Sequence, residues 1–283
     1  MKTNIFRLVS VGLVLFIFAI VVNSCKKDRP DNDTQSSVDN SICEGEFSRI
    51  FPQTNHIAVN DSGVQKTGLP VPFNSCPDYW IDSLDIANGF PITMWMFFGT
   101  DNDGDSLYET GCAGSDGKTR QGIIKAVFSG PWHQAGSTVT MYLKNYYVNS
   151  LKFDGSVAVT NNGNSFTQTV SNGKCTNGTE WTILWSSTRT IAIQVGDTLN
   201  PLDDISTVSG NASGTDRNSK EFSVEIDASN PLVKAASCPY IGKGIQTIKL
   251  AGKKDRIINY GDGTCDNKAK LTIDGNEFEF TLQ

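Results

Sequence analysis

The stretch that decides the fold is Ile245-Gln246-Thr247-Ile248-Lys249-Leu250, Ala251-Gly252-Lys253-Lys254-Asp255, Arg256-Ile257-Ile258-Asn259-Tyr260. Its first and last parts are short runs rich in apolar residues, and its middle part has the glycine and polar residues typical of a turn. The stretch therefore predicts a β-hairpin. Cys238 and Cys265 lie symmetrically about that turn, so an antiparallel register would place them close enough for a disulfide bond.

A similar pattern occurs earlier in the chain. The interval from Cys76 to Gly99 is 23 residues (99 − 76 = 23), and the interval from Cys238 to Gly261 is the same (261 − 238 = 23). Both cysteines precede a proline, and both glycines follow an aromatic residue. The alternative is that short Cys-Pro and Gly matches recur by chance in a glycine-rich β protein.

The earlier copy predicts a second disulfide by analogy. The later copy's midpoint corresponds here to 89.5, which falls beside Asn88-Gly89, the strongest short hairpin signal in the chain. The second arm of this copy has an extra acidic stretch, 101–105, before Cys112. We therefore expect a Cys76–Cys112 bridge. We also expect two related hairpin units, at 75–130 and 237–283, that flank a central meander.

From Tyr79 onward the chain has the pattern of an all-β protein. Runs such as Thr138–Leu143 alternate polar and apolar residues, as expected of strands with one packed face and one wet face. Dipeptides such as Asp154-Gly155 and Asn172-Gly173 tolerate the backbone conformation that tight turns need. We predict an antiparallel meander of hairpins, either sandwich-like or an extended twisted sheet. Residues 200–219, rich in Ser, Gly, Asp and Asn, are the best candidate for a long loop.

Residues 1–24 are predicted to be a signal peptide outside the fold. They have a positively charged start and an apolar run at 8–22, which is short for a membrane span of about 20 residues. Val22-Asn23-Ser24-Cys25 resembles a bacterial lipobox, which implies cleavage before Cys25 and lipidation of its thiol. The alternatives are an uncleaved anchor helix and an ordinary secretory signal followed by a free cysteine.

Residues 25–40 are predicted to be a flexible tether, because they are almost wholly polar and cannot bury a core. The β-rich domain would then span 41–283. Ser41-Ile42-Cys43-Glu44 fits a capping box and predicts one short helix that ends before Pro52. Its apolar face would be lined by Ile42, Phe47, Ile50 and Phe51.

Six cysteines remain once Cys25 is assigned to lipid: Cys43, Cys76, Cys112, Cys175, Cys238 and Cys265. An even number in an exported protein suggests disulfides, although sequence alone allows 15 connectivities. Cys43–Cys175 is the pair left over. The alternative is that the thiols are reduced and packed. Zinc is not expected, because the chain has no CxxC motif and only two histidines.

The formal net charge is −6, with acids and bases interleaved. Because no basic stripe is present, nucleic acid is not expected as a partner. Three tripeptides of the form Asp-Ser/Thr-Leu resemble the O-glycosylation site of exported Bacteroidota proteins. They make Ser83, Ser106 and Thr198 the candidates for glycosylation.

An acidic segment supplies the candidate for a bound cofactor. Asp101, Asp103, Asp105 and Glu109 would offer oxygen ligands to Ca²⁺. Their spacing differs from that of an EF-hand loop, which has glycine at position six and glutamate at position twelve. The alternative is a solvated hairpin loop that binds no ion.

The sequence gives little support for catalysis. His56 and His133 are the only histidines, and neither belongs to a nucleophile motif. The tryptophans would form either a sugar-stacking platform or part of the core, and the core is favoured because β-sheets routinely bury aromatic side chains. They are Trp80, Trp95, Trp132, Trp181 and Trp185.

The lipobox, Asn145-Tyr146-Tyr147-Val148-Asn149 and Tyr260-Gly261-Asp262-Gly263-Thr264-Cys265 make the chain similar to a family of Bacteroidota outer-membrane lipoproteins. The resemblance implies a lipid anchor on Cys25 in the outer membrane, with the protein facing the periplasm or the exterior. It implies no activity.

The sequence therefore leaves three functions open. The first is a non-enzymatic, lipid-anchored envelope protein that binds a glycan or another envelope protein. The second is a hydrolase of envelope or surface polysaccharide, which would need two close carboxylates in a cleft. The third is a purely structural envelope lipoprotein.

Overall fold

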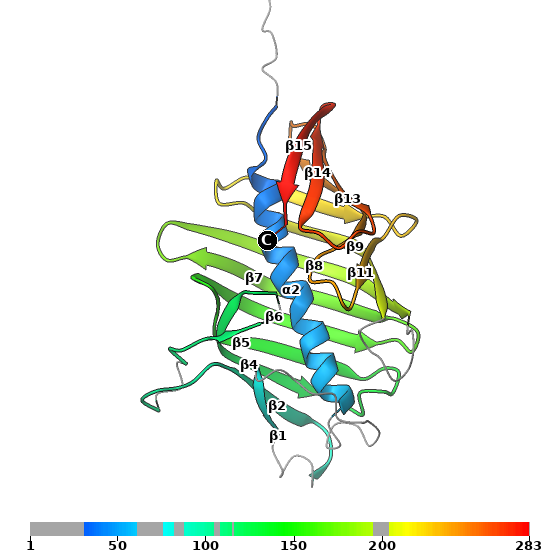
Figure 1. Cartoon of the computed structure of the whole chain (residues 1–283). Helices are drawn as coiled ribbons and strands as arrows, with labels where there is room; N and C mark the ends of the chain where they lie inside the picture. Colours follow the sequence, from blue (N-terminus) through cyan, green and yellow to red (C-terminus); the bar gives the residue numbers. More distant parts are fainter. Residues whose placement is uncertain are drawn as a thin grey trace, which may run out of the picture. The chain divides into compact units, whose positions relative to one another are not determined.

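The computed structural model describes residues 31–60, 76–81, 88–104, 108–114, 116–194 and 204–282. Within these residues the strands form one antiparallel sheet, and helix α2 (Gln35–Asn60) runs across the strands on one of its faces (Figure 1). The predicted all-β class and antiparallel meander are confirmed, in the form of one extended sheet.

The strands, in chain order, are β1 (Asp78–Ile81), β2 (Ile92–Phe98), β3 (Cys112–Ala113), β4 (Thr119–Phe128), β5 (Thr138–Val148), β6 (Leu151–Asn161), β7 (Phe166–Asn177), β8 (Trp181–Gln194), β9 (Ile205–Thr215), β10 (Glu221–Ile226), β11 (Leu232–Ala235), β12 (Lys243–Leu250), β13 (Arg256–Asp262), β14 (Lys268–Ile273) and β15 (Asn276–Thr281). Each strand of the main path pairs with the next along the chain. β3 and β11 lie off that path: β3 pairs with β4, and β11 pairs with both β9 and β12.

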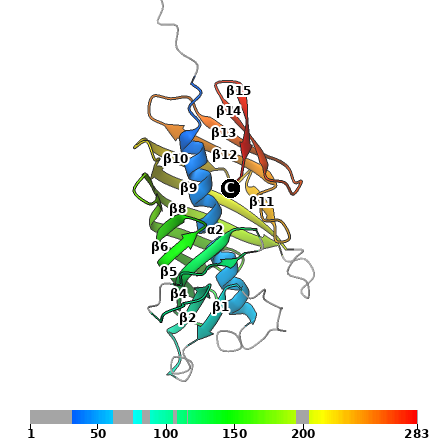
Figure 2. The ribbon, with the colours of Figure 1, turned by 60° about the vertical axis from the view of Figure 1, so that its left-hand side comes forward.

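Burial alternates along most strands and defines two faces of the sheet. We call the face that packs against α2 the inner face and the opposite one the outer face (Figure 2). In β2, for example, Met94 and Met96 on the inner face are fully buried, whereas Trp95 on the outer face is only partly buried. The apolar core therefore lies between the sheet and the helix.

Two predicted turns are wrong. Asp154-Gly155 and Asn172-Gly173 lie inside β6 and β7, where they produce shifts in register rather than chain reversals. Gly122 of β4 accompanies a third shift, with φ at +103°, and an added Cβ there would lie 2.0 Å from the carbonyl oxygen of Asn145. Dipeptides that tolerate left-handed backbone thus serve here as bulges, which bend long strands.

The helix is longer than the sequence indicated. It begins at Gln35, so the predicted tether is wrong for residues 35–40, and it continues through Pro52. Ser36, Asp39 and Asn40 are polar but buried, because partners on the sheet satisfy them. Pro52 itself is exposed, and packing on both sides of it stabilises a helix that proline alone would interrupt.

The predicted loop at 200–219 is also wrong where the structure describes it. Residues 205–215 form β9, which pairs along its length with β8 on one side and, on the other, with β11 at 205–208 and β10 at 210–215. An added Cβ on Gly210 would lie 2.4 Å from the carbonyl oxygen of Thr188. The glycine- and serine-rich composition therefore reflects close backbone approach within a sheet.

Two disulfides are present, and they join the pairs that the sequence favoured. Cys76–Cys112 and Cys238–Cys265 have Cα–Cα distances of 5.8 and 5.7 Å. The earlier of the two predicted hairpin units is not a simple hairpin closed by its disulfide, however. β1 pairs with β2, with Asp78 opposite Phe97, whereas Cys112 lies on β3, which pairs with β4.

The leftover pair is not bridged. Cys43 of α2 and Cys175 of β7 are both free and buried, so the predicted Cys43–Cys175 disulfide is wrong in this structure. Both thiols pack as small apolar side chains in the core. Burial raises the pKa of Cys43 well above its usual value and raises the pKa of Cys175 to about 12, which keeps both in the thiol form.

Candidate functional site

The inner face carries arginines that pair with acids of α2. Arg120 of β4 donates to both carboxylate oxygens of Glu46, at 3.0 and 2.8 Å, and to both oxygens of Asp116, at 2.8 and 2.9 Å. Arg189 of β8 forms the equivalent pair with Glu44. Both arginines and their partners on the helix, Glu44 and Glu46, are almost completely buried.

Neutral polar groups extend this contact along the helix. Trp185 Nε1 donates to Asn40 Oδ1 at 2.9 Å, and Tyr146 Oη donates to Glu46 Oε1 at 2.6 Å. Gln168 Nε2 donates to the carbonyl oxygen of Phe47 at 2.9 Å. Buried polar groups are tolerated because they are hydrogen-bonded in this way.

The charges on the inner face are strongly coupled. Burial by itself would raise the pKa of Asp116, but the hydrogen bonds and charge of Arg120, together with the charge of Arg49, hold that pKa well below its usual range. The inner face is thus filled by the protein's own helix, and its carboxylates are ion-paired. Such groups fix the register of the helix rather than meet a substrate.

Lys234 of β11 lies near this network. Burial, and secondarily the charge of Arg49, lower its pKa to about 8. The amine is therefore only partly protonated slightly above neutral pH, so this group makes the stability of the folded protein depend on pH in mild alkali.

The outer face carries a row of aromatic and cationic side chains that are exposed or partly exposed. Trp80 of β1 pairs with Trp95 of β2, Trp95 pairs with Lys125 of β4, and Lys125 pairs with Tyr142 of β5. We call these four residues the outer row. Trp80 is 51% exposed and Tyr142 is 49% exposed. With a strand spacing of about 4.8 Å, the row runs about 14 Å across the sheet.

Hydroxyl groups prolong the outer row. Tyr142 pairs with Ser156 of β6, and Ser156 pairs with Ser171 of β7. Beside the row, the rings of Phe97 and Tyr108 stack with their centroids 5.6 Å apart and their planes within 17°. The edge of the sheet at β1 therefore presents flat aromatic surfaces next to hydrogen-bonding groups.

The tryptophans divide between core and surface. Trp132 and Trp185 are buried, which confirms the core interpretation for them. Trp181 is partly buried and packs against the guanidinium of Arg217, which lies 4.0 Å from its ring centroid. For Trp80 the core interpretation is wrong, because β1 is an edge strand and its outer face is open.

The acidic segment lies close to the outer row. Ligand oxygens of Asp101, Asp103 and Glu109 lie within 4.8 Å of one another, whereas Asp105 lies outside the described residues. The turn is organised by its own contacts: Gly104 N donates to Asp101 Oδ1 at 2.7 Å and Asn102 N donates to Glu109 Oε2 at 3.1 Å. Exposed acids gather in such turns without a metal too, so the calcium site stays a prediction.

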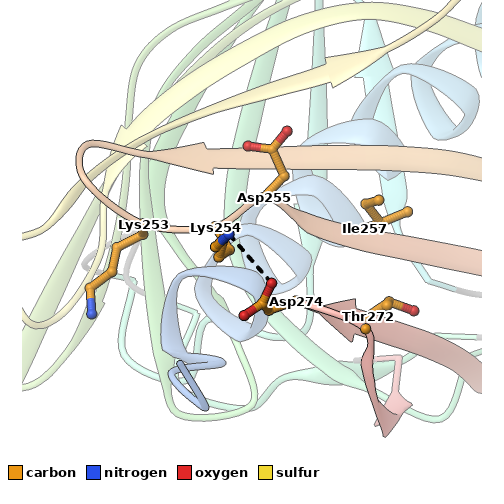
Figure 3. A pocket seen from close by; sticks show the side chains of 7 residues that line it. Lys253, Lys254, Asp255, Ile257, Thr272 and Asp274 are labelled. Carbon is orange, nitrogen blue, oxygen red and sulfur yellow. Dashed lines mark ion pairs between the residues drawn. The ribbon is translucent and has the colours of Figure 1, made fainter. Parts of the chain in front are cut away.

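The far end of the outer face has a different character. A shallow depression of about 420 Å³ is lined there by residues of the β12–β13 turn and of β14 (Figure 3). Lys254 pairs with Asp274 across it at 3.5 Å. A smaller depression of about 290 Å³ contains Lys249, which pairs with Glu225 at 2.8 Å. Both are open, and each contains a lysine that is ion-paired with a carboxylate.

Several predicted positions lie outside the part of the chain that the structure describes. They are the signal peptide at 1–24, Cys25, and the glycosylation candidates Ser83, Ser106 and Thr198. In the described ranges, α2 is neither apolar enough nor sufficiently free of charge to cross a membrane, and no other helix there qualifies. Comparison with family models, with curated proteins and with solved structures finds no match to this chain.

The sequence analysis missed two members of the outer row. Lys125 and Tyr142 carry no motif, but Tyr142 occupies a polar-face position of the alternating run Thr138–Leu143. A large aromatic residue on the face that otherwise has threonine was the available signal. The arginine partners of Glu44 and Glu46 had none, because they are distant in sequence.

Proposed function

We propose that this protein is a non-enzymatic, lipid-anchored envelope protein whose outer face binds a glycan. The observation that carries the proposal is the outer row, in which Trp80 and Trp95 are paired on adjacent strands and Tyr142 lies in the same register beyond Lys125. A sugar ring has a face of C–H groups and a rim of hydroxyls. The C–H face packs on the electron-rich face of an aromatic ring, and the hydroxyls find polar partners.

The dimensions of the row suit a chain of sugars rather than a single one. It spans about 14 Å across strands, and Ser156 and Ser171 continue it with hydroxyl groups. A flat, open surface of this kind binds an extended ligand along its length. Lipidation at Cys25 would hold that surface at the membrane, since attachment of more than one acyl chain gives stable anchoring.

The hydrolase alternative has less support. Glycoside hydrolysis needs two accessible carboxylates on either side of a bound sugar. On the inner face, Glu44 and Glu46 are buried and paired with arginine. On the outer face, Glu225 and Asp274 lie in shallow depressions and are paired with lysines.

The test is binding of soluble protein, lacking residues 1–25, to a panel of immobilised polysaccharides. Trp80→Ala and Trp95→Ala should each weaken binding of the best ligand by about two- to tenfold, because an aromatic contact of this kind contributes about 0.5–1.5 kcal/mol. Leu184→Ala is the matched control, since Leu184 is an exposed apolar residue on the outer face of β8, away from the row. Equal binding by all four proteins would sink the proposal.

A further inference from the structure

We propose that the outer row prefers a glycan bearing carboxylates, a polyuronate, and that Lys125 provides this preference by leaving the Trp95 ring to pair with a sugar carboxylate. The inference rests on the proposed glycan binding and names the ligand class for the same surface. It follows from three observations on the charged side chains of the outer face.

The first observation is the position of Lys125. Its Nζ lies over the ring of Trp95, 5.3 Å from the centroid, and its strand neighbours in the row are Trp95 and Tyr142. The ammonium therefore occupies the ring face on which a sugar would stack. A stacked sugar must displace it, and the displaced ammonium then lies at the rim of that sugar.

The second observation is the lack of a counter-ion. Among the described residues, Lys125 makes no ion pair with any carboxylate, and neither does Lys144, which lies diagonally from it on β5. Two lysines at the far end of the same face differ. Lys249 pairs with Glu225, and Lys270 pairs with Glu277 at 3.0 Å. Lys125 and Lys144 thus place two positive charges, without an ion pair to any described residue, beside the aromatic rings.

The third observation is the distribution of acids around the row. Asp78, Asp101 and Glu109 lie on the side of β1 and the acidic segment, close to Tyr108 and Phe97. Their charge would repel a carboxylate placed over that edge. A polyuronate would therefore bind with its carboxylates over β4 and β5, next to Lys125 and Lys144.

The energetics allow the exchange. An exposed cation–π contact changes an equilibrium constant by about two- to fivefold, so displacing Lys125 from Trp95 costs little. A charge-assisted contact between the ammonium and a carboxylate more than restores that loss. A neutral sugar ring displaces the lysine without offering it a new partner. Lys125 thus penalises neutral glycans and favours acidic ones.

The experiment measures affinity for polygalacturonate oligosaccharides, for alginate oligosaccharides, and for the carboxyl-reduced form of each, which is neutral but has the same ring stereochemistry. The wild type should bind at least one acidic form about fivefold more tightly than its reduced form, and should lose that preference between 50 and 500 mM salt as exposed charges are screened. A sulfated galactan is included to separate carboxylate recognition from a general response to anions.

Lys125→Ala should abolish the preference and should bind the reduced form as well as, or a few-fold better than, the wild type does. Lys125→Arg should restore the preference for the acidic form. Lys249→Ala, which removes one positive charge from the far end of the same face, should leave both affinities unchanged.

The outcomes separate the two proposals. Binding of acidic and reduced forms with equal affinity would overturn the role of Lys125 but leave glycan binding intact. Tighter binding of the sulfated galactan than of either polyuronate would overturn the assignment to carboxylates. Failure of every probe to bind would overturn both proposals. Persistence of the preference in Lys125→Ala would overturn the inference, provided that thermal unfolding shows the variant to be folded.

Discussion

Arg120 and Lys125 lie five positions apart on β4, yet their surroundings are opposite. Arg120 points to the inner face, is 1% exposed and is held by two carboxylates. Lys125 points to the outer face, contacts an aromatic ring and has no carboxylate partner among the described residues. The difference shows that one strand uses positive charge in two ways. On the inner face charge fixes the helix, and on the outer face it remains available to a ligand.

The most damaging way to test this contrast is Arg120→Met. Loss of the guanidinium leaves Glu46 and Asp116 buried without their main partner, so the free energy of unfolding should fall by about 3–5 kcal/mol. Denaturant unfolding measures it. Lys125→Met on the same strand is the matched control and should change stability by less than about 0.5 kcal/mol. Similar losses in both variants would show that the two faces do not differ as described.

Removal of the disulfides tests how much each covalent cross-link contributes to the free energy of unfolding. Cys76→Ser with Cys112→Ser opens a loop of 36 residues, and Cys238→Ser with Cys265→Ser opens one of 27. Each pair should cost about 3–4 kcal/mol through the entropy of the unfolded chain. Thermal unfolding with and without reductant checks this. A variant pair as stable as the oxidised wild type would contradict it.

Acid should weaken the inner face selectively. Because the pKa of Asp116 is held below its usual value, its charged form stabilises the folded protein above the unfolded pKa of about 4, and that contribution is lost as pH falls below it. Asp116→Asn should therefore be less stable than wild type at pH 7 and should show a shallower decline between pH 5 and pH 2.5. Parallel declines would contradict the role of Asp116.

Mild alkali should act in the other direction through Lys234. Its folded pKa of about 8 lies below the unfolded value of about 10.4, so the unfolded chain binds more protons between these limits. Stability contributed by this group should rise as pH increases from 8 to 10. Lys234→Met should remove that rise and be more stable than wild type at pH 7. A rise of the same size in the variant would assign it to another group.

The smallest expected effect on stability is that of Trp80→Ala. Trp80 is half exposed on an edge strand, so the free energy of unfolding should change by less than about 1 kcal/mol, while glycan affinity falls. Paired measurements of unfolding and binding sharpen the comparison between the two faces. A loss of binding that tracks a loss of stability would mean that the outer row is structural.

Local patterns predicted the parts of this fold that depend on local physics. Thr138–Leu143 was recognised as part of a strand by its alternation. The Cys238–Cys265 disulfide followed from symmetry about a turn, and the Cys76–Cys112 disulfide followed by analogy with it. Long strands were divided wrongly, because glycine bulges within β6 and β7 resemble turns. The position of Trp80 at an edge could not be predicted, since it depends on strand order.

The helix shows the clearest limit. Asp39, Asn40, Glu44 and Glu46 give its sequence a polar, tether-like character that argues against burial. They are buried only because arginine, tryptophan and glutamine side chains from distant strands, and from the turn between β9 and β10, hydrogen-bond with them. A polar segment of this kind cannot be told from a solvated one until its partners are known.

The long-range contacts of α2 also set an order of events during synthesis. The helix is made before every described strand, but its partners Arg120, Arg189 and Gln246 follow the residues they contact by 74, 145 and 206 positions. Until those partners are synthesised, the polar side chains of the helix have nothing on the sheet to pair with. An isolated helix is marginally stable, and it gains most of its stability from tertiary packing. The nascent chain therefore cannot complete the contacts between helix and sheet until nearly all of it has emerged, although most strands pair with a neighbour that is close in sequence.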